Sequence, residues 1–307
     1  MTSDIVVQST PPGFPENITM TYASAYREGM ALLSNGGVSN AANETIWLLE
    51  SALGLSRLDI HTEPDTVMDH SSWARAKEVF LRRAGGEPLQ YILGTQIFRG
   101  LDIVVQPGVL IPRPETELLV EEVHSIASAQ DRFALADVGT GSGCLSIALA
   151  VEFPETTIYA IDCSDTAIDV AKSNSHQHSV QDRITFLSGD LLAPLKPFSE
   201  LHDGLSVIVA NPPYIPTDAL PRLQRDVRDF EPHLALDGGA DGLTFYRRLL
   251  REARLFLAPR GYLIMEMGEG QATHICEEAE RVSTWHIRNI RQDAAGIDRV
   301  ICLERRV

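Results

Sequence analysis

The chain has 307 residues, of which 44% are hydrophobic and 22% charged, and its formal net charge is −16 from 42 acidic and 26 basic residues. This composition is typical of a globular protein of about two domains with an ample core. The excess of acids disfavours a protein whose main task is to hold a nucleic-acid backbone, because such proteins rely on clustered lysine and arginine. No apolar run approaches the roughly 18 residues that span a bilayer.

The sequence shows no sign of a targeting segment, a disulfide framework or a metal site. No basic residue precedes Arg27, so the segment resembles neither a signal peptide nor an arginine-rich transit peptide. The cysteines are scattered without a CxxC pair, and His176 and His178 have no acidic or cysteine cluster beside them, which argues against a disulfide framework and a metal site. We expect a cytoplasmic protein without a metal, with a loose tail over residues 1–16.

The first third of the chain divides into two predicted parts. From residue 19 to about residue 83, apolar residues recur at intervals of three and four, as in ANETIWLLESALGL. This predicts a helical domain over residues 1–86, tail included, which has no obvious catalytic group and which we expect to recognise the substrate. Over residues 87–113, short β-rich runs broken by glycine predict a β-hairpin connector.

Residues 114–307 alternate between strand and helix patterns. Strands are predicted at 133–138, 157–162, 184–190, 206–210 and 262–267, helices at 144–153, 164–174 and 241–257, and two final strands at 284–293 and 296–306. Alternation of this kind predicts an α/β fold with a mostly parallel sheet and helices on both faces. The short loop between the last two strands makes that pair an antiparallel hairpin.

A glycine-rich loop, DVGTGSG, follows the first of these strands and opens a helix. Glycines allow a tight turn and let a ligand approach the backbone, and the helix N-terminus supplies unpaired N–H groups. Cys144 stands where a dinucleotide fingerprint requires glycine or alanine, and no GKS-type phosphate loop is present. The loop therefore favours a nucleoside-like ligand. Its candidate cofactor-binding residues are Gly139, Thr140, Gly141, Ser142 and Gly143.

Two acids follow the next two strands. Asp162 ends the second strand, where a carboxylate can accept hydrogen bonds from both ribose hydroxyls. Asp190 ends the third strand, where it can meet a base amino group, and Leu191 follows it. Either acid alone is explained equally well as a turn or helix-capping residue. Together with the glycine loop they predict an adenosyl site.

The fourth strand ends in a second motif, SVIVANPPYIP, at residues 206–216. A proline pair after a strand is common in ordinary loops. Here it follows a predicted adenosyl site, and the carboxyl ends of parallel strands are where such sheets bind ligands. We therefore interpret Asn211, Pro212, Pro213 and Tyr214 as the substrate-binding loop.

These motifs together resemble a known family. The glycine loop, Asp162 and NPPY are similar to those of class I S-adenosylmethionine-dependent methyltransferases, and the closer resemblance is to the HemK/PrmC family of peptide-chain release factor glutamine-N5 methyltransferases. It covers about residues 20 to 305. The residues that carry it are Glu87–Gly94 (EPLQYILG), Phe98–Leu101 (FRGL), Leu110–Glu117 (LIPRPETE), Asn211–Tyr214 (NPPY), Glu231–Pro232 and Asp241–Leu243 (DGL). Leu191 departs from the family, whose members often carry an aromatic residue there.

The resemblance implies methyl transfer from S-adenosylmethionine to the amide nitrogen of the glutamine in the GGQ motif of release factors, by a class I methyltransferase domain over residues 114–307 with a seven-stranded sheet. An amide nitrogen is a poor nucleophile and becomes positive during attack, so it needs acceptors aimed at its N–H bonds. The Asn211 side-chain oxygen and the Pro212 carbonyl can serve as these acceptors. Tyr214 can stack on the flat amide. Asn211 also borders the expected cofactor site.

Two other functions fit part of the pattern. An N6-adenine nucleic-acid methyltransferase also attacks through a planar, weakly nucleophilic nitrogen, but the net charge and the absence of a recognisable DNA-reading domain disfavour it. A non-catalytic adapter for a translation factor would not require the glycine loop and NPPY. The basic run Arg222–Arg228 is either a substrate contact or a charged helix face, and Arg113 and Glu115 are expected beside the site.

Overall fold

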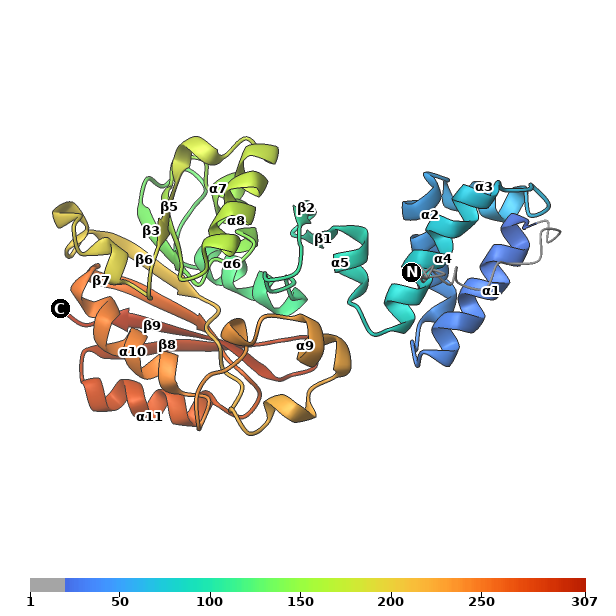
Figure 1. Cartoon of the computed structure of the whole chain (residues 1–307). Helices are drawn as coiled ribbons and strands as arrows, with labels where there is room; N and C mark the ends of the chain where they lie inside the picture. The colour runs from blue at the N-terminus through green and yellow to red at the C-terminus, as the bar shows by residue number, and fades with distance from the viewer. Residues whose placement is uncertain (1–19) are drawn as a thin grey trace, which may run out of the picture. The chain divides into compact units, whose positions relative to one another are not determined.

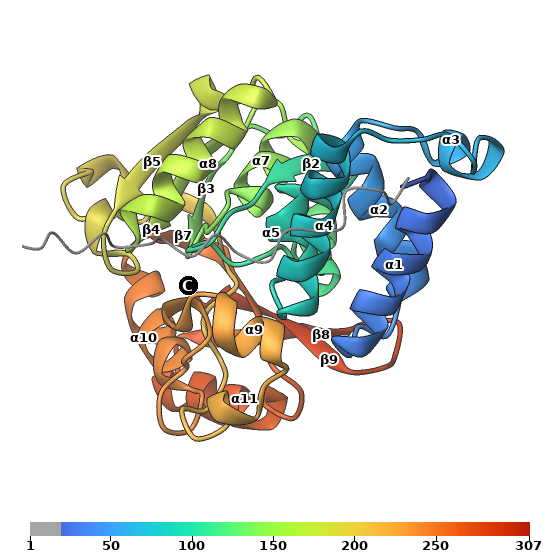
Figure 2. The same cartoon turned by 45° about the vertical axis from the view of Figure 1, so that its right-hand side comes forward.

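The computed structural model describes residues 20–307, so the tail predicted over residues 1–16 lies outside the described residues. The chain forms two compact units that divide between Ile92 and Leu93 (Figures 1 and 2). The first unit is helical and the second is built around a large sheet. Each unit is described by itself below.

The first unit is a small helical bundle. Its helices are α1 (Tyr22–Asn35), α2 (Ala41–Leu53), α3 (Arg57–Thr62), α4 (His70–Ala84) and the start of α5 (Leu89–Leu93). Helices α1, α2 and α4 contact one another, and Leu33, Leu48 and Phe80 are fully buried among them. The helical period of the sequence arises from this packing. A Cβ atom at Gly29 would lie 2.5 Å from the Phe80 ring, so glycine allows α1 to approach α4 closely.

The second unit begins with the predicted hairpin and continues with alternating strands and helices. The hairpin consists of β1 (Thr95–Phe98) and β2 (Leu101–Val104). The strands of the large sheet are β3 (Ala134–Val138), β4 (Thr157–Asp162), β5 (Ile184–Ser188), β6 (Leu205–Ala210), β7 (Leu257–Glu266), β8 (Trp285–Gln292) and β9 (Asp298–Arg305). The helices are α6 (Glu117–His124), α7 (Cys144–Glu152), α8 (Asp165–Gln177), α9 (Arg225–Phe230), α10 (Thr244–Glu252) and α11 (Ala272–Val282). Short 3₁₀ helices are η1 (Pro114–Thr116), η2 (Gln181–Arg183), η3 (Ala193–Leu195), η4 (Ser199–Leu201), η5 (Leu220–Arg222), η6 (His233–Ala235) and η7 (Ala253–Leu255).

The seven strands of the large sheet follow the order β5-β4-β3-β6-β7-β9-β8. The pairs from β5 to β7 are parallel, and β9 is antiparallel to both β7 and β8. This confirms the class I methyltransferase fold with its antiparallel C-terminal hairpin. The hairpin joins the sheet through β9, the second of its strands, so the last strand in sequence is an interior strand.

Helices cover both faces of the sheet. Helices α6, α7 and α8 lie on one side and α10 and α11 on the other (Figure 1). The core under α10 and α11 includes Tyr246 and Leu249, which pack against Ile208 and Leu263 of the central strands. Strands buried on both faces require continuous apolar runs, and β6 has this pattern because its last four residues are all buried.

Candidate active site

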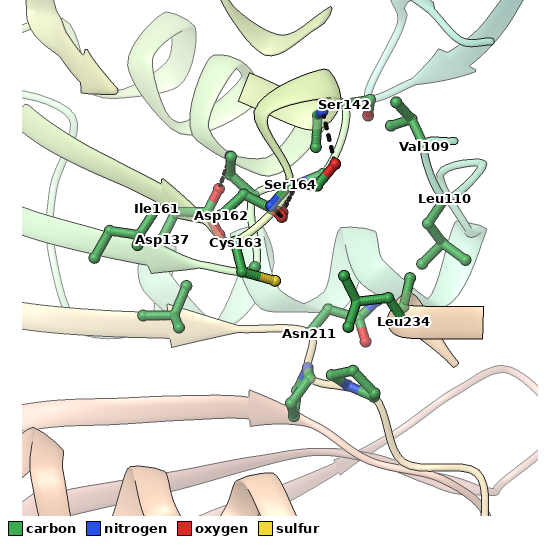
Figure 3. Close-up of a pocket in the computed structure, with 18 of the residues that line it drawn as sticks. Val109, Leu110, Asp137, Ser142, Ile161, Asp162, Cys163, Ser164, Asn211 and Leu234 are labelled. Atoms are coloured by element: carbon green, nitrogen blue, oxygen red, sulfur yellow. Dashed lines mark hydrogen bonds between the residues drawn. The ribbon is translucent and has the colours of Figure 1, made fainter. Parts of the chain in front are cut away.

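A cavity of about 410 Å³ opens at the carboxyl ends of the parallel strands (Figure 3). Its walls are the glycine loop after β3, the segments after β4 and β5, the NPP segment after β6, and the loop that carries Val109 and Leu110. Because parallel strands end at one edge of a sheet, motifs distant in sequence meet there. The structure therefore brings together at this cavity the predicted cofactor-binding residues from Gly139 to Ser142, Asp162, Asp190 and Leu191, with Asn211, Pro212 and Pro213, whereas Gly143 does not line it.

The glycine loop is pinned to the neighbouring strand. The backbone N–H groups of Gly139 and Thr140 both donate to the Ile161 carbonyl, over 2.8 and 2.9 Å. Gly143 precedes α7 with φ +80°, and a Cβ atom there would lie 2.9 Å from Cβ of Ala171. A left-handed backbone and close packing of α7 against α8 both require glycine at this position. The loop thus leaves its backbone accessible to a ligand.

Asp137 is a buried acid under this loop that the sequence reasoning did not assign to the site. Its Oδ2 accepts hydrogen bonds from Thr140 Oγ1 over 2.7 Å and from Ser146 Oγ over 2.6 Å. Burial raises the pKa of Asp137 to about 6, against the opposing effect of the two hydroxyl donors. A charged residue inside an otherwise apolar strand was the signal that could have identified it. Asp137 fixes the shape of the loop from below.

Asp162 connects the first two strand ends. Its Oδ2 accepts from the Gly141 N–H and its Oδ1 from the Ser164 N–H, each over 2.9 Å (Figure 3). Burial raises the pKa of Asp162, against the lowering by these N–H donors. The carboxylate lines the cavity while it holds two backbone segments in place. Its predicted contact with a ribose stays a prediction.

Asp190 lines the same cavity but already has a partner. Arg248 of α10 donates to both of its carboxylate oxygens, over 2.9 and 2.7 Å. We expect Asp190 to meet a base amino group, and no pattern in the sequence indicates this arginine. Leu191 beside it lines the cavity with φ +46°, a left-handed conformation that is uncommon for a leucine.

The four residues of NPPY do not all face the cofactor cavity. Asn211, Pro212 and Pro213 line it, whereas Tyr214 lines a second hollow of about 620 Å³ together with Gly268 and Gln271. Burial raises the pKa of the Tyr214 hydroxyl to about 12. The Tyr214 hydroxyl lies in the electrostatic field of Glu266 and of Arg113, which lines the first cavity, and its predicted stacking role stays a prediction.

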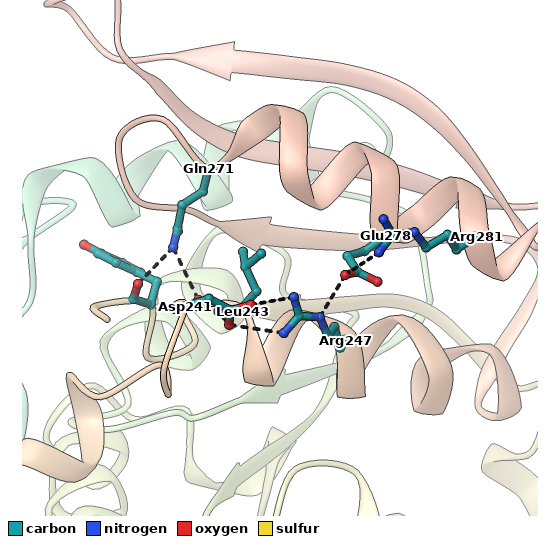
Figure 4. A network of polar contacts seen from close by, with 8 residues as sticks. Asp241, Leu243, Arg247, Gln271, Glu278 and Arg281 are labelled. Atoms are coloured by element: carbon teal, nitrogen blue, oxygen red, sulfur yellow. Dashed lines mark hydrogen bonds and ion pairs between the residues drawn. The ribbon is translucent and has the colours of Figure 1, made fainter. Parts of the chain in front are cut away.

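A polar network holds the backbone after NPPY (Figure 4). Gln271 Nε2 donates to the Tyr214 carbonyl over 2.9 Å, and Gln271 Oε1 accepts from the Gly268 N–H over 2.9 Å. In the same network Arg247 of α10 forms ion pairs with Asp241 over 2.6 Å and with Glu278 of α11 over 2.8 Å. Gln271, which directly precedes α11, therefore holds the backbone of Tyr214, and Arg247 links α10 to α11 beside it.

The loop before α6 is fixed by a buried acid. Glu231 accepts from the Ile111 N–H over 3.3 Å and from the guanidinium of Arg113. Burial raises the pKa of Glu231, against the lowering by Arg113. Arg113 also lines the cavity, as expected. The residues of the basic run at 222–228 form the last residue of η5 and the first part of α9, and their contribution to substrate binding stays a prediction.

Residues 20–307 contain neither a cluster of metal-binding side chains nor a helix able to cross a membrane. In that range no group of three or more histidine, cysteine, aspartate or glutamate side chains is arranged to hold a metal ion. His176 is exposed and His178 contacts the Asp102 carbonyl. No helix in the same range has both the length and the apolar character needed to cross a membrane.

Comparison with known proteins gives consistent matches. The PrmC N-terminal domain family matches residues 24–94, and the Methyltransferase small domain family matches residues 113–224. A release factor glutamine methyltransferase of Geobacter sulfurreducens is 43% identical over 88% of this chain and 91% of its own length. One from Moorella thermoacetica is 40% identical over 94% and 99%. A methyltransferase structure from Pyrococcus furiosus, 17% identical with a TM-score of 0.51, covers 68% of this chain and 91% of its own and shares the fold.

Proposed function

The chain belongs to the family of release factor glutamine methyltransferases, and from this we propose that it methylates the side-chain amide nitrogen (N5) of the glutamine in the GGQ motif of peptide-chain release factors. It is an S-adenosylmethionine-dependent methyltransferase. The observation that supports the reaction best is the meeting of Asn211 and Pro212 with the glycine loop at one cavity. The relatives support this substrate and not the nucleic-acid alternative.

The residues around the cavity fit S-adenosylmethionine. The glycine loop offers backbone that side chains do not cover, since a Cβ atom at Gly141 would meet only the Gly139 carbonyl, at 4.0 Å. Asp162 offers a carboxylate at the end of β4, and Leu110, Leu191 and other apolar side chains line the walls. We assign the residues from Gly139 to Gly143, Asp162, Asp190 and Leu191 to cofactor binding. When bound, the cofactor supplies an electrophilic methyl group, and this chemistry calls for no metal.

Asn211 and Pro212 are assigned to the substrate amide. The lone pair of an amide nitrogen is delocalised, and the nitrogen gains positive charge as it attacks. An acceptor aimed at its N–H bonds strengthens as this charge develops, which lowers the barrier. Asn211 is anchored through its other side-chain atom, because its Nδ2 donates to Thr116 Oγ1 over 3.1 Å. That arrangement leaves Asn211 Oδ1 available to the substrate.

Pro212 and Pro213 keep the loop open. Proline fixes φ and has no N–H, so the pair cannot fold back onto the strand and its carbonyls remain accessible. We assign Tyr214 to stacking on the flat substrate amide, and the closeness of its hydroxyl to Arg113, which lines the cavity, supports this assignment.

The remaining assignments concern partners and compartment. We assign recognition of the release factor to residues 1–86, because this helical part contributes no residue to the cavity among those described. The net charge of −16 argues that the enzyme does not bind nucleic acid directly. A cytoplasmic location matches the location of its substrate.

Replacement of Asn211 tests this function. In Asn211→Ala, single-turnover methylation at saturating cofactor should slow by about a hundred- to a thousandfold, by analogy with the loss of one oxyanion-hole donor with the charge reversed. Cofactor affinity measured by calorimetry should change little, and Asn211→Asp should restore the rate only in part, since a buried carboxylate is costly to desolvate. Asn43→Ala, on an exposed part of α2, is the control.

The product identifies the reaction. Mass spectrometry of the release factor should show one added methyl group on a glutamine, and parallel incubation with DNA should show none. A variant at Asn211 that keeps its turnover but loses the cofactor would make Asn211 a cofactor ligand instead.

A further inference from the structure

Asn211 begins a network of hydrogen bonds that runs from the cavity, which Thr116 also lines, to the buried Glu266. Its Nδ2 donates to Thr116 Oγ1 over 3.1 Å, and Thr116 Oγ1 donates to Glu266 Oε2 over 2.7 Å. The Thr116 and Glu266 side chains are buried, at 4% and 2% exposure. In the close-up of the cavity, Asn211 lies across from the loops that carry Ser142 and Asp162 (Figure 3).

The fold explains why these three residues meet. Ala210 of β6 pairs in register with Met265 of β7, so Asn211 and Glu266 follow at adjacent strand ends. Thr116 ends η1, and the helix α6 that begins at the next residue contacts β7. The chain of hydrogen bonds is therefore built from rigid elements rather than from a mobile loop.

The buried carboxylate of Glu266 determines which atom donates in each of these two hydrogen bonds. An ionised glutamate can only accept, so the single hydroxyl proton of Thr116 must point to Glu266. The Thr116 oxygen is then left as an acceptor, and only the amide N–H side of Asn211 can satisfy it. The amide oxygen of Asn211 consequently turns toward the cavity. The opposite amide orientation would place two acceptors, Asn211 Oδ1 and Thr116 Oγ1, against each other.

We propose that Thr116 and Glu266 are positioning residues that hold Asn211 with its side-chain oxygen toward the substrate amide. This inference rests on the proposed function, since it requires Asn211 to accept hydrogen bonds from the glutamine nitrogen. Thr116 borders the cavity and Glu266 lies behind it, and both act on the substrate amide through Asn211. If the substrate met the amide N–H of Asn211 instead of its oxygen, the developing positive charge would be repelled.

The groups around Glu266 set the pH at which its carboxylate becomes protonated and can no longer fix the orientation of the Asn211 amide. Burial raises the pKa of Glu266 to about 7, the Thr116 hydroxyl lowers it, Glu115 raises it, and Arg299 and Arg113 lower it. The hydroxyls of Tyr214 and Tyr246 and the thiol of Cys144 also lie in its field. A protonated Glu266 can donate to Thr116, which can then donate to Asn211 Oδ1. The direction of both hydrogen bonds is then reversed. Activity should therefore fall as the pH falls through about 7.

Substitutions at Thr116 test the positioning role. In Thr116→Val, kcat should fall by about ten- to a hundredfold because a buried donor loses its partner, while KM and cofactor affinity should stay within about twofold of wild type. Thr116→Ser keeps the hydroxyl and should recover most of kcat. Thr156→Val is the matched control, because Thr156 is equally buried and its hydroxyl has no hydrogen-bond partner among the described residues.

The pH profile separates positioning from mere packing. Wild-type kcat should have an acid limb near pH 7, and Glu266→Gln, which has nearly the same shape but no charge, should lose that limb and have a lower plateau. An unaltered acid limb in Glu266→Gln, or a Thr116→Val variant with normal kcat, would overturn the proposal. If Asn211→Ala is slow in the same assay, only the positioning role fails. If wild type does not methylate a release factor at all, the proposed function itself fails.

Discussion

Asp137→Asn should change how the stability of the second unit depends on pH. Burial raises the pKa of Asp137 from its ordinary value of 3.8 to about 6. A group whose pKa is raised on folding stabilises the folded state below its unfolded pKa, and this contribution is lost as the pH rises through the folded pKa. Asparagine does not titrate in this range, so the unfolding free energy of Asp137→Asn should lack the pH dependence that the Asp137 carboxyl contributes. Its amide oxygen can still accept from Thr140 and Ser146.

The size of the effect follows from the two pKa values. The rise from 3.8 to about 6 corresponds to about 3 kcal/mol of folding free energy between low and neutral pH, at about 1.4 kcal/mol per pH unit. Below about pH 5 an acidic protein is difficult to handle, so the accessible window is smaller. Between about pH 5 and about pH 7.5, the unfolding free energy of wild type should fall relative to that of Asp137→Asn by about 1.4 kcal/mol.

Urea unfolding at several pH values measures this difference. Trp285 is buried in the second unit and its indole N–H donates to the Leu250 carbonyl over 3.0 Å, so its fluorescence reports on this unit when Trp47 and Trp73 are replaced by phenylalanine. Asp182→Asn, at an exposed position, gives the effect of removing one surface carboxylate. A constant difference between wild type and Asp137→Asn across the pH range would refute the reasoning that burial controls this carboxyl.

Three further changes have defined outcomes. Gly143→Ala should destabilise the second unit by about 1–3 kcal/mol, measured by urea unfolding, because alanine is strained at φ +80° and its Cβ would crowd Ala171; unchanged stability would mean that the loop can shift at no cost. Asp162→Ala should weaken S-adenosylmethionine binding by about ten- to a hundredfold in calorimetry, since hydrogen bonds to a charged acceptor contribute about 1.5–3 kcal/mol; unaltered affinity in a folded variant would remove Asp162 from the site. Deletion of residues 1–85 should spare cofactor binding and strongly raise KM for the release factor, and a normal KM would assign the helical part another purpose.

Sequence reasoning succeeded where the signal is local. Strand ends, glycine turns and the proline pair are written in a few consecutive residues, and a parallel sheet brings such ends to one edge. The positions of the glycine loop, Asp162 and Asn211 around one cavity follow from that rule alone. The helical period of the first unit and the short loop before β9 were equally local signals. The catalytic and binding roles of these residues remain predictions.

The long-range partners could not be read in this way. Arg248 lies 58 residues from Asp190, Glu266 lies 150 from Thr116, and Gln271 lies 57 from Tyr214. Each contact depends on the register between elements and on the direction in which a side chain leaves the backbone. No periodicity in the sequence encodes either quantity.

Strand β9 lies inside the sheet although it is the last strand in the described sequence. Until β9 has docked, β7 is therefore an edge strand with the apolar residues Leu263, Ile264 and Met265, and such an edge can pair with another chain. Strands β8 and β9 are close in sequence and can pair within microseconds, so they can dock on β7 as a finished hairpin. A turn that closes readily, here with Asp293 accepting from the Ile297 N–H over 3.0 Å, would shorten the time for which that edge is open to another chain.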